Sequence, residues 1–213
     1  MAAEFDRAFW ENHWTAARGH DAPPAHPALS AELAHARPGT ALDAGSGEGA
    51  EAAWLADHGW DVTAVDLSAH AVLRAASRPD AGSGVVRWVQ ADLTEWEPGH
   101  LFDLVTTFYA HPAMPQDAFY KRISGWVAPG GTLLIVGHHQ ADAHSRGGHR
   151  HPANAVTRPE QVRASLDPAE WAVRTAEVRE RTVTTPGGTR RSLHDVIVRA
   201  ERVRTADGLA HRR

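Results

Sequence analysis

Cysteine is missing from the 213 residues of this chain. Without a thiol the protein can form no disulfide, no thiolate metal site and no cysteine nucleophile. Long apolar runs are also missing, since none approaches the roughly 20 residues that a helix needs to cross a membrane. The first residues, MAAEFD, lack the basic and then apolar pattern of a secretory signal. These absences predict a cytoplasmic protein that does not bind membranes.

The chain also has no excess of positive charge. The formal net charge is −4, with 22 Lys and Arg against 26 Asp and Glu. Bulk electrostatics therefore does not favour nucleic acid as a partner. Arginines do gather near the C-terminus, but no aromatic side chains are interleaved with them, as a surface that stacks on bases would require. We expect no nucleic-acid partner.

Strand-like and helix-like segments alternate along most of the chain, which is typical of βαβ units and a parallel sheet. The expected strands are 40–44, 61–65, 85–90, 102–107 and 132–137, and the expected helices are 4–17, 28–36, 48–58, 68–77, 116–127 and 159–166. Two further β-like stretches, 171–183 and 192–200, flank the sequence TPGG and predict a terminal hairpin. The length and the absence of a linker or repeat predict a single domain over residues 1–213.

The most informative segment is 41–49, which reads ALDAGSGEG. An apolar strand end runs into a glycine-rich turn, and a helix-forming segment follows. Glycines let the backbone turn tightly and let a ligand lie directly against main-chain atoms. Gly45, Gly47 and Ala50 satisfy the dinucleotide pattern G-x-G-x-x-G/A. However, the carboxylate of Asp43 would repel a pyrophosphate, and it suits a ligand that presents an ammonium or sulfonium group.

In an open α/β sheet the ligand binds at the carboxyl ends of the strands. Asp66 ends the second strand, where a carboxylate can accept hydrogen bonds from both ribose hydroxyls or can simply cap the next helix. Asp92 follows the third strand beside Leu93, and it can accept from an adenine amino group or cap a turn. The remaining strand ends carry Thr107, Phe108, Tyr109 and His111 after the fourth strand, and His138 and His139 after the fifth.

Five segments in this order resemble the class I S-adenosylmethionine (SAM)-dependent methyltransferases: LDAGSGEG at 42–49, VDLS at 65–68, ADL at 91–93, FDLV at 102–105 and APGG at 128–131. The resemblance implies a Rossmann-like, doubly wound α/β fold. Its sheet would have seven strands in the order 3-2-1-4-5-7-6, with strand seven antiparallel. It also implies SAM as the cofactor and S-adenosylhomocysteine (SAH) as the product.

The resemblance further assigns parts of the cofactor to parts of the chain. Asp43 and the glycine loop would hold the methionine part, Asp66 the ribose, and Asp92 with Leu93 the adenine. Within the single domain, residues 1–38 would form an N-terminal helical lid, 39–138 the SAM-binding core, and 139–213 a lid loop, a short helix and the hairpin. The expected cofactor-binding residues are Trp14, Asp43, Gly45, Ser46, Gly47, Asp66, Leu67, Asp92, Leu93, Thr107 and Phe108.

The opening FWENHW at 9–14 is similar to the W-D-x-R-Y/W opening of small-molecule methyltransferases of the tellurite-resistance and thiopurine-methyltransferase type. In those enzymes the opening helix closes over the cofactor. His13 stands here where an arginine is usual. Phe5, Phe9, Trp10 and Trp14 are also spaced to share one helix face, so packing alone would equally account for the pattern.

Histidine is frequent, with 15 residues in all and five in the segment 138–151. Imidazole suits zinc, copper and nickel, but the spacing matches no closed structural site, so we expect no metal. Contact with the substrate would account for this segment, and so would an incidental polar loop. Methyl transfer to a hydroxyl, thiol or protonated amine needs a base, and histidine suits that role. His111 is the first candidate base, with His138 and His139 second, whereas a turn before Pro112 would also explain His111.

The sequence therefore predicts a SAM-dependent methyltransferase that acts on an O, N or S atom of a small aromatic or apolar molecule. A non-catalytic SAM-binding protein is one alternative. An RNA methyltransferase is another, although no Asn-Pro-Pro-Tyr-like motif follows the fourth strand. An NAD(P)-dependent oxidoreductase is least favoured, because of Asp43 and because the only lysine, Lys121, lies in a predicted helix. A homodimer remains open.

Overall fold

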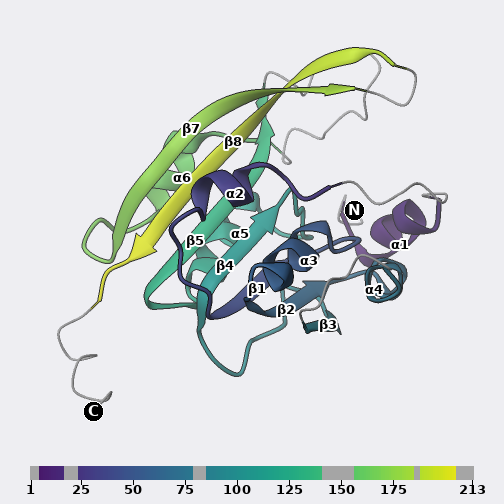
Figure 1. Ribbon diagram of the computed structural model, residues 1–213, viewed down its shortest axis with the longest axis horizontal. Helices are drawn as coiled ribbons and strands as arrows, with labels where there is room; N and C mark the ends of the chain where they lie inside the picture. Colours follow the sequence, from purple (N-terminus) through teal and green to yellow (C-terminus); the bar gives the residue numbers. More distant parts are fainter. Residues whose placement is uncertain (1–4, 17–23, 79–84, 141–155, 185–187, 205–213) are drawn as a thin grey trace.

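A central sheet organises the computed structural model, which describes residues 5–16, 24–78, 85–140, 156–184 and 188–204 (Figure 1). Its strands follow the order β3-β2-β1-β4-β5-β8-β7, and a short strand β6 pairs with β5. The pairs β1–β2, β1–β4, β2–β3 and β4–β5 are parallel. The first five strands are β1 (Thr40–Ala44), β2 (Asp61–Asp66), β3 (Val86–Gln90), β4 (Phe102–Phe108) and β5 (Val127–His139).

A long hairpin completes the sheet at the edge opposite β3. Strands β7 (Trp171–Thr184) and β8 (Arg190–Arg202) pair with each other antiparallel, and β8 pairs antiparallel with β5. The predicted terminal hairpin is confirmed, although both strands are longer than expected. The predicted order 3-2-1-4-5-7-6 with an antiparallel seventh strand is also confirmed, because the unpredicted β6 (Val156–Thr157) only shifts the numbering by one.

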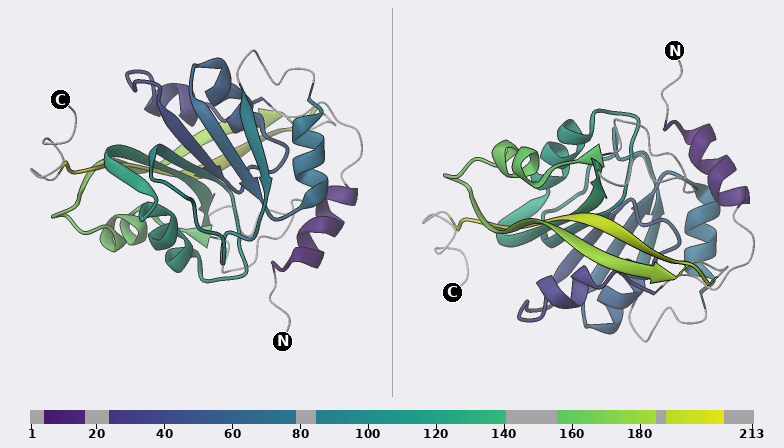
Figure 2. Two further views of the ribbon diagram at one scale, coloured as in Figure 1. Left: turned by 90° about the horizontal axis from the view of Figure 1, so that it is seen from below. Right: turned by 90° about the horizontal axis from the view of Figure 1, so that it is seen from above.

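Two apolar cores lie on the two faces of the sheet, because side chains alternate between faces along each strand. On one face α5 (Gln116–Ser124) and α6 (Pro159–Ser165) pack over a core that contains Leu42 and Phe119. On the other face α2 (Ala28–Glu32) and α3 (Ala50–Asp57) pack over a core that contains Ala41 and Leu55. Helices therefore cover both faces, which confirms the doubly wound α/β arrangement (Figure 2).

Two further helices lie side by side near the β3 edge of the sheet. These are α1 (Arg7–Ala16) and α4 (Ala69–Ala76), which contact each other (Figures 1 and 2). Ser68 caps α4 as predicted, since its hydroxyl accepts a hydrogen bond from the Ala71 N–H over 3.2 Å. The buried alanines Ala71 and Ala75 then hold the helix against the rest of the molecule.

Other element boundaries also differ from the sequence prediction, including three by three residues or more. The helix at 28–36 ends at Glu32, and the helix at 116–127 ends at Ser124. Strand β5 begins at Val127 rather than at residue 132, and the segment Pro129-Gly130-Gly131 forms a bulge inside the strand. Phe102 pairs with Val127 and Leu104 with Thr132, so β5 has extra residues at this point. Gly130 permits the bulge because its φ is +84°.

Candidate active site

A cavity of about 820 Å³ lies at the carboxyl ends of the parallel strands. Its walls come from the glycine loop with the ends of β2 and β3, from helix α1 and Phe5 before it, from residues 24–27, from the loop after β4, and from the ends of β5 and β7. The structure brings most of the sequence-predicted site residues together here. These are Trp14, Gly45, Ser46, Gly47, Asp66, Leu67, Asp92, Leu93, Phe108, His111 and His138.

Three predicted residues lie elsewhere, outside the part of the cavity wall that the structure describes. Thr107 donates its hydroxyl to the carbonyl of Ala44 over 2.8 Å and so joins β4 to β1. The ring of His139 lies 6.2 Å from that of His194 on β8. Asp43 is buried, with 1% of its surface exposed. A position at the end of a strand is therefore not enough to predict that a side chain faces the cavity, because alternate residues of a strand point to opposite faces of the sheet.

Asp43 lies on β1 directly before the glycine loop. Thr106 donates its hydroxyl to Oδ1 of Asp43 over 3.2 Å. The buried Oδ2 of Asp43 has no hydrogen-bond partner among the described residues, and neither has Oγ of Ser46. Burial, and then the negative charge of Glu51, raise the pKa of Asp43 well above its usual value. A carboxylate in this position is poised to accept a donor or a positive charge.

Asp66 holds the glycine loop in shape. Its Oδ2 accepts a hydrogen bond from the Gly47 N–H over 2.8 Å, and its Oδ1 accepts one from the Ser68 N–H over 2.9 Å. Asp66 therefore binds the N–H of Ser68, which is itself the N-cap of α4, and the same side chain also lines the cavity. Burial raises the pKa of Asp66.

The conformation of the glycine loop requires residues without a side chain at two positions, Gly45 and Gly47. A Cβ on Gly45, whose φ is +84°, would lie 2.3 Å from Cβ of Ala110, so the loop after β4 closes directly over this glycine. A Cβ on Gly47 would lie 3.0 Å from the ring of Trp14. The glycines thus allow two other segments to approach the backbone closely.

Asp92 caps the turn after β3, which is one of the two roles that the sequence left open. Its Oδ1 accepts hydrogen bonds from the N–H of Thr94 over 2.9 Å and from the hydroxyl of Thr94 over 2.7 Å. These contacts form the turn after β3. Asp92 and Leu93 also line the cavity, at the place where the sequence predicted the adenine of a nucleoside.

The lid helix α1 is docked over the glycine loop through polar contacts on its buried side. Glu11 accepts from the Ala69 N–H over 2.7 Å, from the Ser68 hydroxyl over 3.0 Å, and from Nδ1 of His70 over 2.6 Å. Trp10 donates its indole N–H to the carbonyl of His111 over 3.1 Å. The lid is therefore fixed both to the start of α4 and to the loop after β4.

Glu11 gives a direct test of this docking. The His70 contact, together with the hydrogen bonds from Ala69 and Ser68, lowers the pKa of Glu11 to about 2, so the carboxylate is charged at neutral pH. Replacing Glu11 by alanine should release the lid and weaken binding of SAM, while the core stays folded. We expect ligand-dependent quenching of tryptophan fluorescence to fall in Glu11→Ala. Unchanged quenching and affinity would show that Glu11 does not control the lid.

His111 follows β4 and has its tautomer set by a neighbour. Gln116 donates its amide N–H to the carbonyl of Ala110 over 2.9 Å, so its Oε1 faces Nδ1 of His111 at 3.2 Å. Because an amide oxygen only accepts, Nδ1 of His111 must carry the proton in the neutral ring. The lone pair of the neutral imidazole is then on Nε2, the atom that a general base would use, and this atom is buried in the ligand-free structure.

Aromatic rings form a continuous stack along the cavity wall. The ring of Tyr109 lies 4.4 Å from that of His138, and His138 lies 5.4 Å from His111. Phe5 of the lid segment continues the stack, 5.3 Å from His111. The interplanar angles are 28°, 25° and 30°, so the rings are nearly parallel. The stack therefore links the end of β5, the loop after β4 and the lid.

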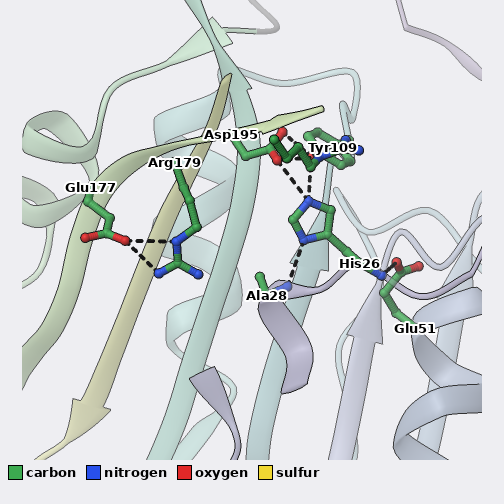
Figure 3. Close-up of polar contacts among 8 residues, drawn as sticks. His26, Ala28, Glu51, Tyr109, Glu177, Arg179 and Asp195 are labelled. Carbon is green, nitrogen blue, oxygen red and sulfur yellow. Dashed lines mark hydrogen bonds and ion pairs between the residues drawn. The ribbon is translucent and has the colours of Figure 1, made fainter. Parts of the chain in front are cut away.

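Sequence reasoning missed a buried polar cluster behind this wall (Figure 3). Asp195 accepts hydrogen bonds from Nε2 of His26 over 3.0 Å, from the Tyr109 hydroxyl over 2.5 Å and from Nε of Arg181 over 2.5 Å. The Ala28 N–H points to Nδ1 of His26 at 3.1 Å, so the proton of the neutral ring is on Nε2. Each side chain of the cluster thus has a defined donor or acceptor role.

The cluster also fixes an unusual backbone. Tyr109 has a φ of +54°, which is rare for a residue with a bulky side chain. Burial, and then the nearby Asp195, raise the pKa of Tyr109, so its hydroxyl stays protonated. Burial alone would raise the pKa of Asp195, but hydrogen bonds from His26, Tyr109 and Arg181 lower it to about 2. The anchored Tyr109 lets the chain turn and places Ala110 and His111 over the glycine loop.

One sequence signal could have pointed to this cluster. Asp195 interrupts the stretch LHDVIV at 193–198, where Val196, Ile197 and Val198 are buried apolar residues. A lone acid beside such a run is a buried charge that needs partners. The partners are 86 and 169 positions away, for Tyr109 and His26, so the sequence could not name them.

The described residues contain no group of three or more His, Cys, Asp or Glu side chains that could hold a metal ion. Most of the histidine-rich segment, residues 141–151, lies outside them. Among the helices that can be described, none is both long and apolar enough to cross a membrane.

Comparisons with known proteins agree with the fold and the loop. Residues 41–131 match the family model described as a methyltransferase domain. An uncharacterised methyltransferase of Mycobacterium tuberculosis is 39% identical over 97 residues, which are 45% of this chain and 48% of that protein. The chain thus matches about half the length of its curated relatives.

Solved structures extend the likeness to the whole sheet. A protein studied for the conversion of a disulfide bond into a thioacetal group during echinomycin biosynthesis has a TM-score of 0.72 at 19% identity, over 95% of this chain and 94% of that one. The N-methyltransferase NodS of Bradyrhizobium japonicum, solved with SAH, has a TM-score of 0.59 at 21% identity, over 82% and 83% of the two chains. Residues 41–131 thus resemble a methyltransferase domain, and the solved structures share the fold, which agrees with the resemblance to class I SAM-dependent methyltransferases.

Proposed function

We propose that this protein is a SAM-dependent methyltransferase that acts on a small molecule. The observation that carries the proposal is the glycine loop with Asp43 beneath it, at the floor of a cavity that a lid helix covers. The methyltransferase-domain match over the same residues supports it. A cavity of about 820 Å³ falls within the ~300–1,000 Å³ that is usual for small-molecule sites.

The residues of the site fit SAM in charge and in hydrogen bonding. Oγ of Ser46 lines the cavity and lacks a partner among the described residues, so it can bind the methionine part of the ligand. The buried Oδ2 of Asp43 also lacks one, and it would contribute its charge from beneath the glycine loop. Glu51 also lines the cavity, and burial raises its pKa, so a ligand cation nearby would favour its charged form. Asp66 would then bind the ribose and Asp92 the adenine, as the resemblance implies.

SAM, when bound, would supply the electrophilic methyl group. The chain must then exclude water and hold the acceptor atom in line with the departing sulfur, and such positioning can contribute roughly 7–11 kcal/mol in favourable cases. The docked helix α1 would exclude water. His111, with its lone pair on Nε2, would take the proton of an O, N or S acceptor, and His138 would support the ring from the stacked position.

We also propose that residues 1–38 act as a lid, 39–138 as the cofactor-binding core, and 139–213 as a lid loop, a short helix and the terminal hairpin of one domain. The RNA methyltransferase alternative finds no support in the net charge of −4. The cytoplasmic location, the absence of a nucleic-acid partner and the oligomeric state stay predictions from the sequence.

Calorimetry with four ligands tests the proposal. We expect SAM and SAH to bind and NAD and NADP to bind far more weakly, because a carboxylate at position 43 opposes a pyrophosphate. Tight binding of NAD without binding of SAM would contradict the proposed cofactor. Binding of SAM without turnover of any acceptor in a broad panel would favour the non-catalytic alternative.

A further inference from the structure

Charges divide the cavity into two halves. Every acidic side chain in its described lining comes from the half formed by the glycine loop and the ends of β2 and β3, namely Glu48, Glu51, Asp66 and Asp92. The rest of the described wall carries the permanent cation Arg181 together with His111 and His138, whereas His26 adjoins the acidic half, because its backbone N–H donates to Oε1 of Glu51 over 3.0 Å. The acidic half suits a cationic cofactor. The other half, where the acceptor would bind, suits an anion.

Arg181 reaches this wall from the end of β7, and the buried cluster holds it there. Its Nε donates to Asp195 over 2.5 Å, and its Nη2 donates to the Tyr109 hydroxyl over 3.3 Å. These two bonds use only part of the donor set of a guanidinium group, which is a planar fork suited to carboxylates. The side chain is thus oriented before any ligand arrives, which lowers the entropic cost of binding.

Asp195 does not cancel the effect of Arg181 on the cavity. The Asp195 side chain is only 4% exposed and accepts hydrogen bonds from three donors, whereas the Arg181 side chain is 29% exposed. Asp195 is also absent from the described cavity lining, where Arg181 and its neighbours Val183 and Thr184 stand. A ligand in the cavity therefore meets the guanidinium group, with the carboxylate behind it.

We propose that Arg181 is the specificity-determining residue of the acceptor site and binds a carboxylate group of a small aromatic acid. This inference rests on the proposed function, since it names the substrate class of the same site. The carboxylate pairs with the guanidinium at the end of β7, and the aromatic part lies along the stacked rings of Tyr109 and His138. The atom to be methylated then faces His111 and the acidic, cofactor-binding half.

Two probes of nearly equal shape test the charge requirement. Benzoate and benzamide are titrated into the protein already saturated with SAH, and binding is followed by calorimetry or by ligand-observed NMR. Binding of SAH is measured first, so that failure of the proposed cofactor is recognised separately. We expect benzoate to bind on the order of 10- to 100-fold more tightly than benzamide, as for hydrogen bonds to charged groups.

The matched control lies two residues away on the same strand. Arg179 pairs with Glu177 (Figure 3). It also pairs with Glu32, and it is absent from the described cavity lining. Arg181→Gln should abolish the preference for benzoate, and Arg179→Gln should retain it. Arg181→Lys keeps the positive charge but lacks the planar guanidinium group, so it should lose part of the preference for benzoate. This variant remains informative if Arg181→Gln does not fold.

Three results would overturn the proposal. These are equal binding of the two probes to the wild type, no binding of benzoate to a protein that binds SAH, and an equal loss of preference in Arg179→Gln and Arg181→Gln. Absence of SAH binding would instead contradict the proposed function.

Discussion

Replacing His111 by glutamine is expected to lower kcat by roughly 10²–10⁴-fold, the usual contribution of a general base. The change should leave SAM affinity nearly intact, because the glycine loop, Asp66 and Asp92 are untouched. Glutamine fills similar space and still offers polar atoms, but it cannot take up the proton of the acceptor. Steady-state kinetics with saturating SAM measures the effect.

The pH profile separates a lost base from a disturbed fold. Only the neutral imidazole can accept a proton, so kcat of the wild type should rise with pH as the base loses its proton. This limb should disappear in His111→Gln. A structural defect would lower the whole profile without changing its shape.

His139 supplies the matched comparison. It was a candidate base on the sequence, but its ring lies beside His194 and outside the described cavity wall. His139→Gln should therefore keep wild-type turnover, and His138→Gln should fall between the two because His138 stacks on His111. Wild-type kinetics in all three variants would mean that the acceptor is already deprotonated in solution, as an acidic phenol or a thiolate is.

The fold was largely predictable because its signals are local. Apolar runs bounded by glycine and proline predicted five parallel strands to within one or two residues at most boundaries. The prediction of β1 at 40–44 was correct at both ends. The start of β5 was wrong because a proline-glycine-glycine sequence normally ends a strand. In this sheet the neighbouring β4 keeps pairing on both sides of the bulge, and tertiary context overrides the local preference.

The half of the candidate site around the glycine loop was easier to predict from the sequence than the half around Arg181. The cofactor half is encoded in short contiguous motifs, so Gly45, Asp66 and Asp92 could be placed from spacing alone. The acceptor half is assembled from His26, Tyr109, Arg181 and Asp195, which meet only after the hairpin has joined the sheet. No local pattern links such residues. Even in the cofactor half, periodicity could not tell that Thr107 would bond across to β1.

Replacing Asp43 by asparagine should separate stability from function. In the folded protein, burial and then the charge of Glu51 raise the pKa of Asp43, so its ionisation opposes folding. The free energy of unfolding of the wild type should therefore decrease as the pH rises through that raised pKa. Asparagine keeps an oxygen for the Thr106 hydroxyl but cannot ionise, and it should remove this decrease. Thermal unfolding of the ligand-free protein at pH 5 and pH 8 measures the difference.

The same substitution should weaken SAM binding, by on the order of 10- to 100-fold, because a hydrogen bond to a charged group contributes ~1.5–3 kcal/mol. A bound cation lowers the pKa of Asp43, so wild-type binding should release protons and its calorimetric enthalpy should depend on the buffer. That dependence should shrink in Asp43→Asn. Asp103→Asn is the control, since Asp103 bonds to Thr40 at the opposite end of β1. Equal SAM affinity in Asp43→Asn and the wild type would show that the buried carboxylate shapes the loop without meeting the cofactor's charge.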